Sequence, residues 1–65
     1  MTYAEFRLEM VAAAEAWERA AETARLAGKL ALAHALSENA VRCHYLAEPD
    51  PDAEKLFDEA ARVTP

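Results

Sequence analysis

The sequence predicts an all-α protein built as a long helical hairpin followed by a short third helix. Alanine makes up about a quarter of the 65 residues, and alanine has the highest helix propensity of all residues. The only glycine, Gly28, divides residues 3–47 into two stretches that contain no proline. Because the turn at Gly28 is short, the second helix should return antiparallel to the first. Pro49 and Pro51 then separate the second helix from the third.

The first helix is predicted over residues 3–27. Thr2 and Glu5 have the spacing of a capping box, in which each side chain bonds the other residue's backbone N–H. Gly28 should end the helix because glycine readily adopts the left-handed conformation found after a helix. Apolar residues at alternating spacings of three and four predict one seam along this helix. The seam consists of Tyr3, Phe6, Met10, Ala13, Trp17, Ala20, Ala24 and Ala27.

The second and third helices are predicted over residues 29–47 and 51–63. The second is apolar almost all round, which is typical of a helix that is covered on more than one side. Asp50 is a favourable N-cap for the third helix. Residues 64–65 should fray. The whole chain, 1–65, forms a single domain close to the lower size limit for an unaided hydrophobic core.

Composition argues against several classes of function. The net charge is -5, and seven Lys and Arg residues are scattered among twelve acids, whereas a nucleic-acid binder needs clustered basic residues. No run of eighteen apolar residues is available to span a membrane. Cys43 is the only cysteine, so no intramolecular disulfide can form. The N-terminus has no secretory pattern, and we therefore expect a cytoplasmic protein.

Helix lengths predict an uncovered surface at the start of the first helix. That helix should be about 37 Å long and the second about 28 Å, and the third is expected to turn away from the N-terminus. Tyr3, Phe6 and Met10 would then lack a neighbour within the chain. Exposed apolar patches usually mark interfaces, so we expect self-association there, most simply as a homodimer. Trp17 is expected in the core, against Leu32, Leu36 or Tyr45.

Residues 14–56 resemble a tetratricopeptide-type helical repeat. Ala14-Glu15-Ala16-Trp17 matches the opening of that repeat, and Gly28 stands at its turn. The chain departs from the family at Ala24 and Ser37, where the family has aromatic residues. Such a resemblance implies protein recognition through a groove lined by the first helix, and at those offsets stand Glu15, Glu18, Glu22 and Arg25. The other matching positions are Ala21, Leu30, Ala33, Ala40 and the segment 50–56.

No catalytic or metal site is expected. His34 and Glu38 are spaced to share a metal ion, but two ligands are too few. Cys43 and His44 point about 100° apart on a helix, so they do not form a nucleophile–base pair. The sequence therefore predicts a helical protein–protein interaction module, an adaptor, assembly factor or accessory subunit, with no cofactor. The alternatives are a small regulator such as an antitoxin or transcription accessory, and a metal- or cofactor-binding bundle formed on dimerisation from His34, Glu38 and His44.

Overall fold

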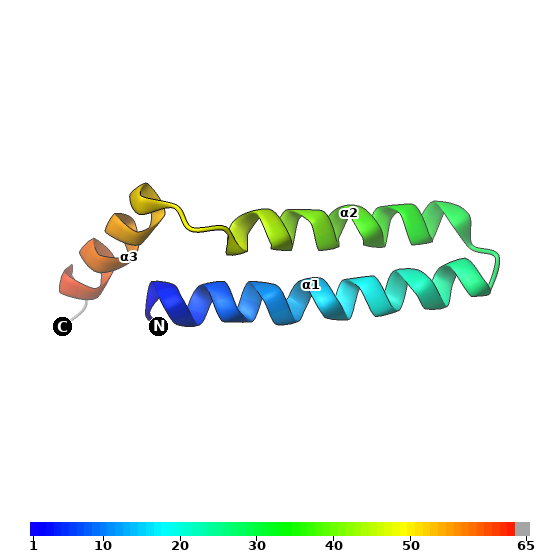
Figure 1. Cartoon of the computed structure of the whole chain (residues 1–65), viewed down its shortest axis with the longest axis horizontal. Coiled ribbons are helices and arrows are strands. Elements are labelled where there is room, and N and C mark those ends of the chain that lie inside the picture. The colour runs from blue at the N-terminus through cyan, green and yellow to red at the C-terminus, as the bar shows by residue number, and fades with distance from the viewer. Residues whose placement is uncertain (64–65) are drawn as a thin grey trace.

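The structure is a computed structural model that describes residues 1–63, and it confirms the predicted all-α hairpin with a short third helix. The elements are α1 (Tyr3–Leu26), α2 (Leu30–Ala47) and α3 (Pro51–Val63). α1 and α2 lie antiparallel and side by side, and α3 follows beyond the open end of the hairpin (Figure 1). The helix ends agree with the sequence prediction to within a residue. The expected fraying of residues 64–65 lies outside the described residues.

The ends of α1 are fixed by local hydrogen bonds. At its start, the Glu5 N–H donates to the Thr2 hydroxyl over 3.1 Å, and the Thr2 N–H donates to the Glu5 carboxylate over 3.2 Å. Hydrogen bonding of the Glu5 carboxylate to the backbone and side chain of Thr2 lowers the pKa of Glu5. At its end, the Gly28 N–H donates to the Arg25 carbonyl and the Lys29 N–H to the Ala24 carbonyl. With Gly28 at a φ of 76°, these bonds form the Schellman motif that ends a helix.

The two helices of the hairpin meet through alanine. Six alanines, three from each helix, form the buried core together with Tyr3. Ala14 and Ala21 are seven residues apart in α1, and Ala33, Ala40 and Ala47 repeat at the same spacing in α2. Seven residues are close to two helical turns, so these side chains line one face of each helix. Because alanine is small, the two backbones can approach closely along that line.

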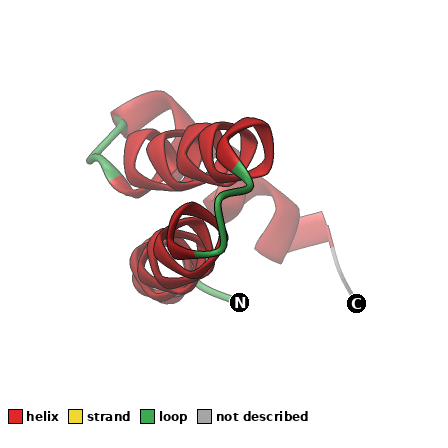
Figure 2. Cartoon of the chain, turned by 90° about the vertical axis from the view of Figure 1, so that its right-hand side faces the viewer, coloured by secondary structure: helices red, strands yellow, loops and turns green. Residues whose placement is uncertain are grey.

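The hairpin is a layer one helix thick. The molecule measures 48 × 20 × 14 Å, and its shortest dimension is little more than the diameter of one helix with its side chains. Seen along the helix axes, α1 and α2 are stacked one above the other with no third helix along their length (Figure 2). Globular domains usually bury their apolar faces between two packed layers. Here the second layer is provided by α3 only at the open end.

α3 packs against the start of α1, and the expectation that Tyr3 and Phe6 lack a neighbour within the chain is wrong. The Phe57 ring centroid lies 5.5 Å from that of Tyr3 and 5.0 Å from that of Phe6. The Tyr3 hydroxyl donates to the Glu48 carbonyl over 3.1 Å and accepts the Asp50 N–H over 2.9 Å. These two hydrogen bonds to the linker direct α3 across the open end of the hairpin instead of away from it.

The Asp50 cap of α3 is confirmed. Its carboxylate accepts the N–H of Asp52 over 3.0 Å and that of Ala53 over 3.4 Å. The side chain of Asp50 thus starts α3, while the backbone N–H of the same residue is held by Tyr3. One short linker therefore both begins the helix and fixes its direction.

Trp17 lies at the edge of the hairpin, and the expectation that it belongs to the core is wrong. Its side chain is 38% exposed. The expected neighbours Leu32 and Tyr45 are exposed as well, by 49% and 72%. The reason is the line of alanines: α1 meets α2 at Ala14 and Ala21, and a closely approached pair of helices leaves no room for an indole between them.

Candidate interaction surface

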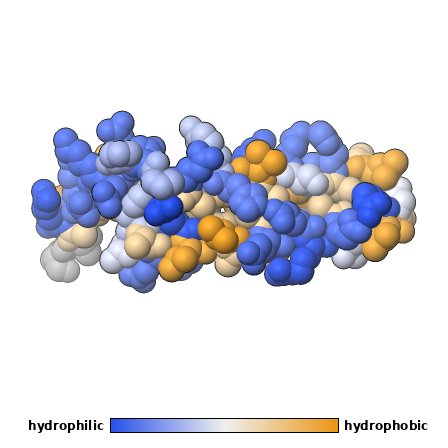
Figure 3. All heavy atoms as spheres, in the orientation of Figure 1, coloured by the Kyte–Doolittle hydropathy of each residue, from blue (hydrophilic) through white to orange (hydrophobic). Residues whose placement is uncertain are grey.

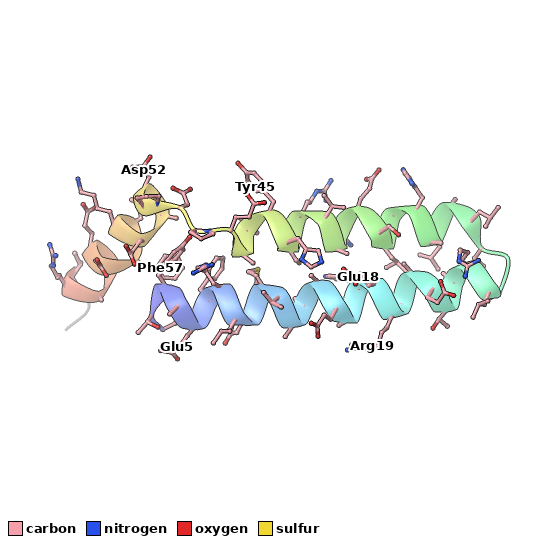
Figure 4. All side chains as sticks on the ribbon, in the orientation of Figure 1. Glu5, Glu18, Arg19, Tyr45, Asp52 and Phe57 are labelled. Atoms are coloured by element: carbon pink, nitrogen blue, oxygen red, sulfur yellow. The ribbon has the colours of Figure 1, made fainter. Side chains whose placement is uncertain are left out.

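One face of the hairpin is mainly polar, and Val11 and Leu30 are its exposed apolar residues. The His44 imidazole of α2 lies 2.5 Å from the Glu18 carboxylate of α1, so both side chains are on this face. Figure 4 shows Glu18 directed toward α2. Each residue follows a core alanine by four positions, which is an advance of about 40° around the helix. Within α1 and α2, every residue in that position relative to Tyr3 or to a core alanine is polar, since the positions after Ala24 and Ala47 fall beyond the ends of these helices. These residues, the polar face, are Arg7, Glu18, Arg25, Ser37 and His44.

The opposite face is apolar. Residues that precede a core alanine by one, or follow it by three, lie about 60–100° away on the other side of the helix. Because the contact between Glu18 and His44 places the polar positions of both helices on one side, these positions share the other side. With the heptad alanines 14, 21, 33, 40 and 47 as reference, Asn39 is the one polar residue among these positions within the helices. These residues, the apolar face, are Ala13, Trp17, Ala20, Leu32, Leu36, Asn39, Cys43 and Leu46.

The apolar face is only partly covered within the chain: Trp17, Leu32 and Leu46 are exposed, and its other five residues are half-buried. Leu32 and Leu46 are 49% and 48% exposed, and Leu36 is half-buried. The large aliphatic side chains come from α2, whereas α1 contributes Trp17 and small alanines. No member of the face is ionisable as a carboxylate or a basic group. The result is an uncharged strip along the hairpin on which no further helix of the chain packs.

The charges of the polar face are mostly satisfied within the chain. Arg25 donates to the Glu22 carboxylate, with the Nε–Oε2 bond at 3.0 Å. This pairing lowers the pKa of Glu22 and raises the pKa of Arg25. Arg7 donates from Nε to the Ala47 carbonyl over 2.7 Å, which satisfies a carbonyl at the end of α2. Hydrophilic residues cover much of the surface seen in Figure 3, with apolar side chains scattered among them.

The residues predicted to form the interface lie in two different environments. Tyr3 is 8% exposed and belongs to the core, while Phe6 and Met10 are half-buried. The four residues of the predicted acidic strip are all exposed on α1, as expected. Two of its three carboxylates already have partners, Glu18 with His44 and Glu22 with Arg25. The predicted strip comprises Glu15, Glu18, Glu22 and Arg25.

The three residues of the alternative metal site are not gathered in one place by the hairpin. His34 pairs with Glu38 at 2.8 Å along α2, whereas His44 pairs with Glu18 across the hairpin. Within residues 1–63, no group of three or more His, Cys, Asp or Glu side chains could hold a metal ion. In the same part of the chain, no helix is long and apolar enough to cross a bilayer.

An open cleft of about 280 Å³ lies where the linker meets the two long helices. Its walls are partly apolar, from Phe6 and Leu46, and partly the backbone and side chains of the linker around Pro49. Leu46 also belongs to the apolar face. The cleft therefore extends the uncovered apolar surface toward the open end of the hairpin.

Comparison of the chain with models of known protein families, with curated proteins and with solved structures gave no match. The alanines that carry the resemblance to a tetratricopeptide-type repeat, among them Ala21, Ala33 and Ala40, are buried between α1 and α2. Small residues at these positions are what any closely packed hairpin needs. The resemblance therefore stays a prediction.

Proposed function

We propose that this protein is a helical protein–protein interaction module that recognises its partner by helix packing on the apolar face. The observation that carries the proposal is the uncovered strip of apolar side chains along the hairpin. A core of six alanines and one tyrosine buries little apolar area, while larger side chains such as Leu32 and Leu46 remain half exposed. Exposed strips of this kind are typical of surfaces that another chain covers.

Packing on the apolar face would stabilise the protein as well as hold the partner. Fully burying a leucine contributes about 1.5–3 kcal/mol, so covering the exposed half of Leu32 or Leu46 contributes roughly 1 kcal/mol each. Trp17 would add an aromatic anchor of the kind that dominates binding energy at interfaces. A small domain is only marginally stable, so contributions of this size add substantially to the stability of the folded hairpin.

The mode of recognition is the packing of helices into a groove or a bundle. Such a surface suits an adaptor, an assembly factor or an accessory subunit, whose role is to join other chains. The charges of the polar face are paired within the chain, which supports the choice of the apolar face as the site of contact. The single cysteine fits work in a reducing compartment such as the cytoplasm.

Capture of cross-linked partners by matched variants tests this proposal. Leu46→Glu places a charge on the apolar face, whereas Val41→Glu places the same charge on the same helix outside that face. Val41 and Leu46 are 66% and 48% exposed, so neither variant should unfold the hairpin. Any chain bound through the apolar face, identified by mass spectrometry after cross-linking in the native host, should be retained by Val41→Glu and lost with Leu46→Glu. An identical set of chains with both variants would contradict the proposal.

A further inference from the structure

We infer that the chain packed on the apolar face is a second copy of this protein, so that two hairpins form a four-helix bundle. This inference rests on the proposed function, because it names the partner of the same face. It adds the identity of that partner and the way in which the two copies meet. Three properties of the hairpin support it: the area it exposes, the shape of the face and the placement of charge.

The exposed area matches what a dimer would remove. The molecule exposes 5031 Å² of surface, whereas a compact folded chain of 7.2 kDa exposes about 4,100 Å². The excess of about 900 Å² is close to the roughly 800 Å² that each partner buries in an interface of standard size. One further layer of helices on one face of the hairpin would therefore bring it to the surface area of an ordinary globular protein.

The shape of the apolar face is self-complementary. Its α2 side carries the large side chains Leu32, Leu36 and Leu46, and its α1 side carries Trp17 with the small residues Ala13 and Ala20 on either side of it. A twofold axis parallel to the helices places α2 of each copy on α1 of the other. The leucines of one copy then pack over the alanines of the other and against its Trp17, so that the indole is covered as well. All neighbouring helices in this bundle are antiparallel, the usual arrangement of four-helix bundles.

The charges do not oppose this contact. Each copy has a net charge of -5, and juxtaposed like charges would be unfavourable. The carboxylate of Glu18 lies on the polar face, paired with His44, and Glu22 is paired with Arg25. Stacking the two apolar faces keeps these groups on the outside of the bundle, in water. A copy that approached through the polar face would instead bring these carboxylates together.

Sedimentation equilibrium of the full chain over a range of concentrations, with two matched variants, tests this inference. Leu30 and Leu32 both lie in the first turn of α2, on opposite sides of its line of alanines. Changing either leucine to glutamate alters the net charge equally. The wild type and Leu30→Glu should be dimers. Leu32→Glu should raise the dimer dissociation constant by roughly 100-fold or more, because the dimer would bury an unpaired carboxylate.

Far-UV circular dichroism of the same samples separates dissociation from unfolding. Leu32 is half exposed in a single chain, so Leu32→Glu should remain helical as a monomer. A wild type that is monomeric at all concentrations, or an equal loss of dimer in both variants, would overturn the inference. A monomeric wild type whose cross-linked partners still depend on Leu46 would refute the second copy and leave the proposed function standing.

Discussion

Replacing Ala14 with leucine should lower the free energy of unfolding by about 1–3 kcal/mol. Ala14 is 0% exposed and belongs to the line of alanines between α1 and α2, so three added carbon atoms would force the helices apart. Folded proteins are stabilised by only about 0.05–0.15 kcal/mol per residue. A loss of this size is therefore a large part of the stability of a 65-residue chain. Urea denaturation followed by circular dichroism measures it.

Ala12→Leu is the matched control for Ala14→Leu. Ala12 is exposed on the same helix two residues away, and alanine and leucine have similar helix propensities. The control should change the unfolding free energy by no more than about 0.5 kcal/mol, as is usual at surface positions. If both variants were equally stable, the hairpin would not be joined through its line of alanines.

Replacing Tyr3 with alanine should release α3 while leaving the α1–α2 hairpin folded. The change removes the ring that contacts Phe57 and leaves the Glu48 carbonyl and the Asp50 N–H without their shared hydroxyl. Removing a large buried aromatic side chain typically costs about 3–5 kcal/mol. Here that cost falls on the docking of α3, which contacts the rest of the molecule mainly through this aromatic cluster. The backbone amides of α3 should then become nearly unprotected against hydrogen exchange, which NMR measures.

Tyr3→Phe separates the two parts of this contact. Phenylalanine keeps the ring against Phe57 but removes both hydrogen bonds. We expect the docking of α3 to be weakened by about 1–3 kcal/mol. Protection of the α3 amides should therefore fall between that of the wild type and that of Tyr3→Ala. Unchanged protection of α3 in Tyr3→Ala would show that the aromatic cluster does not hold this helix.

The helices themselves follow from local signals in the sequence. Thr2 and Glu5 begin α1, Gly28 ends it, and Asp50 begins α3, in each case through hydrogen bonds within a few residues. Such bonds depend on the order of neighbouring residues and on little else. That is why the predicted and observed ends of the helices agree closely.

The direction of α3 could not be obtained in this way. It depends on the Tyr3 hydroxyl, which bonds Glu48 and Asp50 across more than forty residues of sequence. A sequence shows that a tyrosine hydroxyl needs partners, but not which distant backbone groups it will find. With α3 expected to turn away, the start of α1 was predicted to be the uncovered surface, whereas α3 covers much of it.

In the middle of α1, the predicted line of contact with α2 is displaced by one residue. The predicted seam contains Ala13, Trp17 and Ala20, whereas the structure buries Ala14 and Ala21; Tyr3 and Ala24 of the same seam are buried as predicted. Alanine occupies both sets of positions, so the pattern of apolar residues alone does not distinguish them. A shift of one residue rotates the helix by about 100°. This rotation moves Trp17 from the expected core to the apolar face.

A signal for the apolar face was nevertheless present in the sequence. Alanines repeat every seven residues at 33, 40 and 47, and polar residues follow the first two of them at a distance of four. Large apolar residues precede positions 33 and 47, at Leu32 and Leu46. Aligning both helices on their small residues, and not on their large ones, would have separated the polar face from the apolar face.

Acrylamide quenching of Trp17 fluorescence at increasing protein concentration tests most directly whether the apolar face is covered by another chain. Trp17 is the only tryptophan, and it lies on that face with 38% of its surface exposed in a single chain. We predict that the quenching constant falls as the protein associates, and that Leu32→Glu keeps the high value of the dilute protein. A quenching constant that stays high and unchanged up to concentrations at which the protein is fully associated would contradict it.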